Sequence, residues 1–340
     1  MELKRKTSMI RWGIIGCGKV TEVKSGPAFS KVKNSKLVAV MRRDAALAED
    51  YAKRHNVPRF YSSADDLIND NEVDAVYVAT PPASHAEYTI KVLKAGKPVY
   101  IEKPMALNYK ECERINKTAE KYKLPVFVAY YRRTLPGFLR IKELIENDAI
   151  GKVRFVKLEI YSFLSEEEKA GRLPWRVIPE ISGAGHFFDL ASHQLDWLDF
   201  VFGPVDKVES VVLNQAGLYK AEDFVSASFV FPGNIAANGT WCFTTAPVSN
   251  KDSIEIFGEK GMIISSTFSF EPIVLINENG RSEFENVRPE HVQYYLIEQI
   301  VKELSGEGQG AVSTGATAAR TSRVMDKVVK EYYKNNRYGK

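Results

Sequence analysis

The sequence of 340 residues is poor in cysteine and has no long apolar run. Its three cysteines, Cys17, Cys112 and Cys242, form an odd and widely spaced set, which excludes a disulfide framework and the paired spacing of a zinc site. A reducing, cytoplasmic location fits this cysteine usage best. No stretch approaches the roughly 18 uninterrupted apolar residues that a membrane span needs, so we do not expect a membrane protein.

The sequence also has no block of charge of one sign. Its 47 Lys and Arg residues are interleaved with 43 Asp and Glu residues, and the formal net charge is +4. A nucleic-acid-binding surface would gather basic residues on one face or along one helix. Nucleic acid is therefore not an expected partner, and charge alone does not indicate which partner binds.

The length corresponds to about two domains of roughly 150 residues each. In the first third, short β-branched runs alternate with amphipathic segments, which is typical of βαβ units and a parallel sheet. The expected strands are 10–15, 37–41, 75–79, 98–101 and 126–129, and the expected helices between the later ones are 45–55, 83–95 and 109–122. We expect a Rossmann dinucleotide-binding domain over residues 1–128.

After about residue 130 the apolar residues alternate with polar ones, as in residues 225–229, and this period of two indicates antiparallel sheet. Pro232-Gly233-Asn234 is a hairpin signal between two such runs. Helices are expected at 186–202, 292–304 and 316–333. The pattern predicts an α/β domain over residues 129–340 with a large sheet.

A glycine-rich turn follows the first strand and opens a helix, the context in which such a turn indicates dinucleotide binding. Gly16 permits the tight turn and Gly18 lets the backbone approach a pyrophosphate. Thr21 replaces the third glycine of the G-x-G-x-x-G pattern, so looser packing is expected there. A purely structural turn is the alternative. The candidate cofactor-binding residues of this turn are Gly16, Cys17, Gly18, Lys19 and Val20.

The second strand ends at Arg42-Arg43-Asp44, where NAD-binding domains place an acidic residue for the ribose 2′-hydroxyl. Guanidinium groups suit a 2′-phosphate, so we expect NADP to be preferred. Asp44 keeps NAD possible, and a solvated strand end is the alternative to both.

Four polar side chains follow the third and fourth expected strands. Thr80 and His85 come after one strand, and Glu102 and Lys103 come after the other. Ligands of open α/β sheets bind at the carboxyl ends of the strands, so all four are candidate cofactor contacts. Lys103 is also a candidate catalytic group, because its ammonium can polarise a carbonyl or its amine can accept an alcohol proton. A surface turn is the structural alternative.

The long helix carries His186, Asp189, His193 and Asp196, whose spacing of 3, 4 and 3 places them along one helix face. We expect His193 to act as general acid and base, and Asp189 to orient it or to bind a substrate hydroxyl. Hydrogen bonding within a buried helix is the structural alternative. A metal site is a further one, but no cysteine or additional histidine completes it, so no metal is expected.

Further candidate substrate contacts lie near these segments. Arg176, which follows Trp175, could close over a polyol. Tyr131 belongs to the run Tyr130–Arg133 after the fifth strand. The candidate substrate-binding residues are Lys103, Tyr131, Arg176, Asp189 and His193.

Four motifs in this order resemble the glucose–fructose oxidoreductase, inositol dehydrogenase and rhizopine-catabolism (Gfo/Idh/MocA) family. They are Gly16-Cys17-Gly18, Ala79-Thr80-Pro81-Pro82, Glu102-Lys103-Pro104, and Asp189 followed by His193. The resemblance covers essentially the whole chain. It implies a Rossmann domain followed by an α/β domain with a mostly antiparallel open sheet, which often forms a dimer or tetramer interface.

The resemblance also assigns roles. Lys103 matches the family lysine that contacts nicotinamide and substrate, and His193 matches the acid/base histidine of the Asp-x-x-x-His pair. A cis peptide is expected at Lys103-Pro104. Arg42 departs from the usual acidic residue, and Tyr130-Tyr131 stands where many relatives have asparagine.

The leading interpretation is an oxidoreductase that moves a hydride between NADP or NAD and a sugar, cyclitol or related polyol or ketose. We expect a homodimer or homotetramer assembled through the second sheet. Two alternatives remain: a glycoside hydrolase that uses transient oxidation by bound NAD, and a non-catalytic ligand sensor of the same fold.

Overall fold

The computed structural model describes residues 9–308 and 310–335. Two compact units share the chain. The first unit comprises the residues up to Ala106, Lys110–Thr134 and Pro289–Ala319, and the second comprises Leu107–Tyr109, Leu135–Arg288 and the residues from Arg320 onward.

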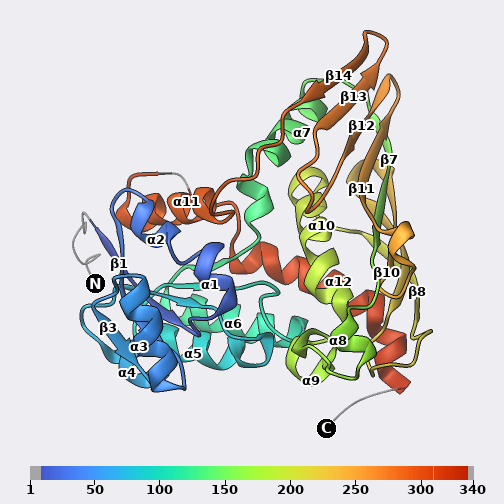
Figure 1. The fold of residues 1–340 in the computed structure, drawn as a ribbon. Helices are drawn as coiled ribbons and strands as arrows, with labels where there is room; N and C mark the ends of the chain where they lie inside the picture. The colour runs from blue at the N-terminus through green and yellow to red at the C-terminus, as the bar shows by residue number, and fades with distance from the viewer. Residues whose placement is uncertain (1–8, 309, 336–340) are drawn as a thin grey trace. The chain divides into compact units, whose positions relative to one another are not determined.

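The strands and helices follow the chain as labelled in Figure 1. The strands are β1 (Ile10–Ile15), β2 (Ser35–Met41), β3 (Arg59–Tyr61), β4 (Ala75–Val78), β5 (Val99–Ile101), β6 (Val126–Val128), β7 (Val153–Tyr161), β8 (Lys207–Leu213), β9 (Phe224–Phe231), β10 (Ile235–Cys242), β11 (Lys251–Gly258), β12 (Gly261–Ser265), β13 (Ile273–Asn277) and β14 (Gly280–Phe284). The α-helices are α1 (Lys19–Val23), α2 (Ala28–Lys31), α3 (Ala45–Arg54), α4 (Ala64–Asn69), α5 (His85–Lys94), α6 (Tyr109–Tyr122), α7 (Pro136–Glu146), α8 (Glu166–Lys169), α9 (Pro179–Ser182), α10 (His186–Phe202), α11 (Tyr294–Ser305) and α12 (Gly315–Asn335).

The first unit is built on a parallel sheet with the strand order β3-β2-β1-β4-β5-β6. Its central strands are apolar and buried on both faces, as shown by Ala75–Val78, because helices cover both sides of a doubly wound sheet. The order reverses next to β1, so β1 and β4 flank the switch point at which such sheets bind ligands. The expected Rossmann fold is confirmed.

The second unit is built on an eight-stranded sheet with the order β14-β13-β12-β11-β7-β10-β9-β8. All its neighbouring strands are antiparallel except the parallel pair β7 and β10. Helix α10 packs against this sheet, where Gln194 accepts a 2.7 Å hydrogen bond from the indole N–H of Trp241. The expected mostly antiparallel sheet is confirmed, as is the hairpin at Pro232-Gly233-Asn234.

Several elements differ from the expectation. Strand β3 and helix α7 were not expected. Strand β3 has three residues without a β-branched side chain, too few to show a period. Helix α7 begins with Pro136 in its first turn, as proline favours, and the ring of its Phe138 lies 5.4 Å from that of Trp197.

None of the described helices combines the length and apolar character that a membrane-spanning helix needs. The three cysteines are free thiols in the structure.

Candidate functional site

The glycine-rich turn between β1 and α1 has the form expected of a dinucleotide-binding loop. Gly16 has a φ of +91°, and a Cβ atom there would lie 2.7 Å from the Thr80 side chain and 2.9 Å from the Thr80 amide nitrogen. A larger residue at Gly16 would therefore strain the backbone and meet the loop after β4. The turn and Thr80 are thus adjacent at the carboxyl ends of β1 and β4.

Gly18 differs from Gly16, because nothing in the chain itself requires a glycine there. Its backbone is extended, and the atom nearest to a Cβ added at this position would be the Gly16 carbonyl oxygen at 3.8 Å. A glycine whose side-chain space is open leaves room for a ligand to approach the backbone closely. The turn therefore fits a dinucleotide pyrophosphate.

Thr21, which stands in place of the third glycine, is fully buried, so the expectation of looser packing is wrong. Its hydroxyl accepts a 3.0 Å hydrogen bond from the Gly18 amide and donates to the Gly18 carbonyl at 2.9 Å. The Tyr51 hydroxyl of α3 donates to the Thr21 carbonyl at 2.8 Å. Thr21 thus holds the turn shut with hydrogen bonds.

The other residues of the turn are arranged in two ways. Cys17 is buried, burial raises the pKa of its thiol to about 11, and its amide donates to the Met41 carbonyl at 3.1 Å. The thiol is therefore neutral and unreactive at neutral pH. Lys19 is exposed and Val20 is half-buried at the start of α1.

Arg42, Arg43 and Asp44 are all exposed after β2. The Asp44 carboxylate accepts a 3.1 Å hydrogen bond from the Leu47 amide and caps the N-terminus of α3. In the described part of the chain, no carboxylate lies within salt-bridge distance of either guanidinium group. The acidic residue is thus used by the helix, and the two arginines present positive charge at this strand end.

His85 lies buried between two loops. One ring nitrogen is 2.7 Å from the Thr80 carbonyl oxygen and the other is 3.0 Å from that of Pro104. Burial lowers the pKa of His85, so the ring is neutral at neutral pH. The structure thus places His85 as a brace between the loops after β4 and β5, with its side chain shielded from solvent.

Glu102 sits at the end of β5 and anchors the segment that carries Lys103. Its Oε1 accepts from the Tyr77 hydroxyl and from the Gln293 amide, both at 2.5 Å, while its Oε2 accepts from the Lys103 backbone amide at 3.1 Å. Tyr100 donates to the Gln293 side-chain oxygen at 2.8 Å. The expected cis peptide at Lys103-Pro104 is confirmed.

This anchor was not predicted from the sequence beyond Glu102 itself. Burial and the Glu102 charge raise the pKa of Tyr77 well above its usual value, so its hydroxyl stays a hydrogen-bond donor. Gln293 is only 1% exposed and reaches Glu102 from the return segment before α11. A lone glutamine far along the chain gives no signal of this contact in the sequence.

In the second unit, helix α10 carries the other candidate residues. Asp189 accepts a 2.7 Å hydrogen bond from the Arg176 guanidinium, which lies 4.5 Å from the centre of the Trp175 ring. The structure thus brings together Arg176 and Asp189, two of the expected substrate contacts. His193 is 3% exposed, and its ring meets that of Phe268 edge to face.

The remaining polar residues of this helix have structural partners. His186 lies 3.0 Å from the Glu168 carboxylate, and this contact is the main reason that the pKa of Glu168 falls to about 2. The Asp196 carboxylate accepts from the Thr321 hydroxyl at 3.1 Å. Among the described residues, no group of three histidine, cysteine or carboxylate side chains could hold a metal ion, so the metal alternative has no support.

Glu222 holds the start of α10 and was not predicted. It is fully buried, and its carboxylate accepts from the Gly185 amide at 2.9 Å and from the Tyr333 hydroxyl at 2.6 Å. Burial raises the pKa of Glu222 to about 7. A Cβ on Gly185 would lie 2.9 Å from the same carboxylate, so a glycine is needed at this cap.

Tyr131 is 7% exposed, and its ring lies 5.1 Å from the Arg132 guanidinium carbon. Arg133 is also buried and donates to the Val312 carbonyl at 3.3 Å. This segment after β6 is therefore a packed part of the first unit.

Comparison with known proteins gives matches over most of the chain. The model of the oxidoreductase family with an NAD-binding Rossmann fold, GFO_IDH_MocA, matches residues 10–130, and that of the GFO/IDH/MocA C-terminal domain matches residues 138–264. Oxidoreductase P35 of Formosa agariphila is 40% identical over 326 residues, which cover 94% of this chain and 98% of the relative.

Two more distant proteins are also similar. Trans-1,2-dihydrobenzene-1,2-diol dehydrogenase of Bos taurus is 25% identical over 276 residues, 81% of this chain and 79% of the relative. The crystal structure of aldose-aldose oxidoreductase from Caulobacter crescentus has a TM-score of 0.83 at 21% identity, and the match covers 96% of this chain and 98% of that one. At this identity the likeness shows the fold alone.

Proposed function

The chain belongs to the GFO/IDH/MocA family of oxidoreductases with an NAD-binding Rossmann fold, and we propose that it transfers a hydride between a nicotinamide and a carbinol or carbonyl carbon of a sugar, cyclitol or related polyol. The Gly16–Gly18 turn carries this proposal, because it leaves backbone space open at Gly18 beside the loop that contains Thr80. The nicotinamide, when bound, supplies or accepts the hydride.

The first unit supplies the cofactor contacts of the proposal. Backbone groups of residues 16–20 hold the pyrophosphate, and Thr80 lies next to them. Glu102 fixes the backbone amide of Lys103 at 3.1 Å, so the start of the lysine side chain has a defined position. His85 supports the same loops from beneath.

The catalytic residues of the proposal are Lys103, His193 and Asp189. The Lys103 ammonium stabilises negative charge that develops on the substrate oxygen, and His193 donates or accepts the proton. Asp189 orients His193 or binds a substrate hydroxyl. Arg176, held by Asp189 at 2.7 Å, and Tyr131 complete the proposed substrate contacts.

We propose NADP as the preferred cofactor. Arg42 and Arg43 are exposed without a carboxylate within salt-bridge distance in the described residues, whereas Asp44 is engaged as the cap of α3. Two guanidinium groups favour a 2′-phosphate. NAD remains usable, since the ribose hydroxyl can still be bound by backbone groups.

The substrate class is proposed from two kinds of support. The paired Arg176 and Asp189 offer a donor and an acceptor suited to neighbouring hydroxyls. The Bos taurus relative is named for a diol, and the Caulobacter crescentus structure is named for aldoses. Both names refer to compounds with hydroxyl groups on neighbouring carbons.

We also propose that the enzyme is a cytoplasmic homodimer or homotetramer assembled through the second sheet. Phe155 of β7 is 40% exposed and stacks on Phe257 of β11 at 4.3 Å, and Val211 and Leu213 of β8 are 56% and 42% exposed. Apolar side chains on one open sheet face favour burial against a second copy. A monomer by sedimentation equilibrium would contradict this assembly.

The experiment that tests the activity is a screen of sugars, cyclitols and ketoses with NADPH, NADH and their oxidised forms, followed by nicotinamide fluorescence. We expect turnover with at least one polyol or ketose and a higher kcat/KM with NADP(H). Cleavage of a glycoside without a net change in cofactor would instead favour the hydrolase. Ligand binding without any turnover would favour the sensor.

A further inference from the structure

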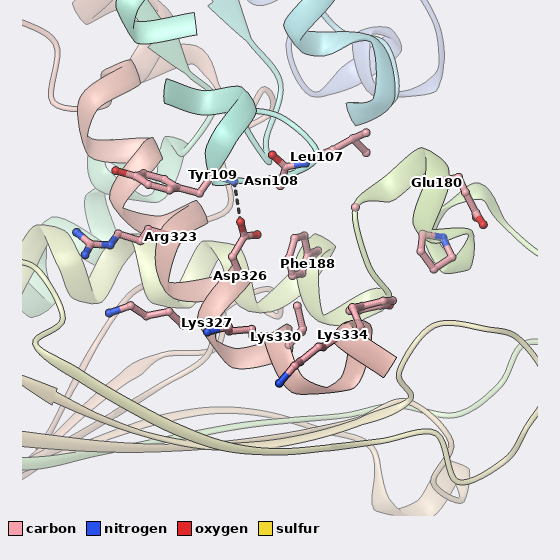
Figure 2. A pocket seen from close by; sticks show the side chains of 14 residues that line it. Leu107, Asn108, Tyr109, Glu180, Phe188, Arg323, Asp326, Lys327, Lys330 and Lys334 are labelled. Carbon is pink, nitrogen blue, oxygen red and sulfur yellow. Dashed lines mark hydrogen bonds between the residues drawn. The ribbon is translucent and has the colours of Figure 1, made fainter. Parts of the chain in front are cut away.

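A second cavity lies in the second unit, away from the residues to which the function is assigned. It has a volume of about 680 Å³ and is formed by α12, α9, Phe188 of α10 and the segment Leu107–Tyr109 (Figure 2). Its size falls within the range of small-molecule sites. Among the described residues that line it, neither Asp189, His193 nor Arg176 appears.

One side of this cavity is positively charged. Arg323, Lys327, Lys330 and Lys334 extend from α12 along its edge (Figure 2). Only Lys334 has a carboxylate within salt-bridge distance in the described part of the chain, Glu331 at 3.5 Å. Glu180 and Asp326 are the acidic lining residues, so the α12 side carries excess positive charge that attracts an anion.

Asp326 adds a hydrogen-bond acceptor in the middle of the same helix face. Its Oδ2 accepts from the Tyr109 amide at 2.8 Å, as Figure 2 shows, while Oδ1 has no hydrogen-bond partner among the described residues. A carboxylate oxygen of this kind is a strong acceptor for a hydroxyl group. The Asn108 side chain lines the cavity beside it and offers both a donor and an acceptor.

Aromatic side chains complete the lining. Tyr109 and Tyr333 are half-buried there, and their rings present apolar surface with a polar tip. Cations, a carboxylate acceptor and aromatic rings in one cavity match a ligand with an anionic group, several hydroxyls and an apolar ring face. We propose that this cavity binds a negatively charged monosaccharide, either a sugar phosphate or a uronic acid.

The cavity is connected to the start of helix α10. Tyr333 lines it and donates to the Glu222 carboxylate, which in turn accepts from the Gly185 amide at the N-cap of α10. A ligand in the cavity would therefore contact a side chain that helps to hold this helix. The proposal itself rests on the lining, and it stands whether or not the enzyme transfers a hydride.

The test is calorimetric titration of the whole protein with glucose 6-phosphate and glucuronate, with glucose and inorganic phosphate as probes for each half of the ligand. We expect one of the two anionic sugars to bind with a Kd below about 1 mM, and both glucose and phosphate to bind more weakly. No saturable binding of either anionic sugar would overturn the proposal. Phosphate binding as tight as that of glucose 6-phosphate would overturn the sugar assignment.

Variants locate the binding. The double variant Arg323→Gln, Lys327→Gln should raise the Kd at least about tenfold, which corresponds to about 1.4 kcal/mol. Asp326→Asn should weaken the sugars but leave inorganic phosphate unweakened, and its retained oxygen can still accept from Tyr109. Lys152→Gln, an exposed lysine of the same unit, is the matched control and should leave the Kd unchanged.

Two further variants separate this cavity from the proposed substrate and cofactor sites. Asp189→Asn and Arg42→Gln should leave the affinity for the anionic sugar unchanged. Loss of binding in either variant, with wild-type affinity in the α12 double variant, would place the ligand elsewhere and overturn the proposal. An unfolded α12 variant would be recognised by its melting temperature, and Asp326→Asn then provides the test.

Discussion

Each of the two units uses a buried glutamate to hold a segment that carries a proposed catalytic residue, but the two glutamates differ in kind. Glu102 is 7% exposed and accepts hydrogen bonds from Tyr77, Gln293 and the Lys103 amide. Glu222 is fully buried and accepts from Gly185 and Tyr333, and its pKa is raised to about 7.

The difference shows how the same residue type serves in two ways. Glu102 stands next to the residue it positions, so a local motif, Glu102-Lys103-Pro104, reveals it in the sequence. Glu222 positions a helix that begins 37 residues earlier along the chain, so no local pattern reveals it. The first glutamate defines one side chain, whereas the second fixes the end of a whole helix and is exposed to protonation near neutral pH.

The largest expected effects come from the proposed catalytic residues. Lys103→Met and His193→Ala should each lower kcat by roughly 10²–10⁴, the range for loss of an acid/base group. Steady-state kinetics on a polyol found by the screen measures this. Lys152→Gln is the control for charge removal, and near-normal turnover in either catalytic variant would remove that residue from the mechanism.

Glu222→Gln tests the second anchor through its pH dependence. Because the folded-state pKa is raised from 4.5 to about 7, the folded chain binds the proton more tightly than the unfolded chain. The free energy of unfolding of the wild type should therefore fall by a few kcal/mol, relative to Glu222→Gln, as the pH rises from about 4.5 to about 7.

Urea unfolding of both proteins across this pH range measures the difference. Glu146→Gln, at a side chain that is 61% exposed, is the matched control and should follow the wild type. Parallel pH profiles for wild type and Glu222→Gln would show that Glu222 titrates normally, and the contrast with Glu102 would then be lost.

The two glycines of the turn should separate folding from binding. Gly16→Ala places a side chain at a φ of +91° against Thr80 and should lower the free energy of unfolding by roughly 1–3 kcal/mol. Gly18→Ala has open space, so its stability should stay near that of wild type while its affinity for the dinucleotide falls. Thermal unfolding with and without cofactor distinguishes them, and equal destabilisation by both would refute this assignment.

The smallest expected effect concerns the cofactor's ribose. Arg42→Gln should weaken NADPH binding about tenfold, about 1.4 kcal/mol, while NADH binding changes little. Arg59→Gln, an arginine that already pairs with Asp70 at 3.6 Å, serves as the control. Equal losses for both cofactors would mean that Arg42 contacts a group that NADPH and NADH share.

The sequence predicted regular elements well where the pattern was long. The bounds of β1, α6 and α10 agree with the structure because apolar periodicity and a terminating glycine or strand end define them. The three-residue β3 and the helix α7 carried too little local signal. The parallel pairing of β7 with β10 could not be foreseen, because strand pairing depends on the whole sheet.

The candidate site was predicted unevenly for the same reason. Motifs within a few residues, such as Gly16–Gly18 and Glu102-Lys103, were found, because the chemistry and the positioning lie side by side in sequence. The role of Asp44 as a helix cap depends on where α3 begins, and that of Thr21 depends on the hydrogen bonds of the turn. Both can be read only from the folded backbone.

The most direct test of the central claim is a titration of the wild type and Gly18→Ala with NADPH and NADH, followed by cofactor fluorescence and melting temperature. A ligand at 100 times its Kd adds about 2.7 kcal/mol to the free energy of unfolding. We predict saturable binding to the wild type, tighter for NADPH, and weaker binding to Gly18→Ala. Binding of neither dinucleotide to the cofactor-free wild type, or binding unaffected by Gly18→Ala, would contradict the account.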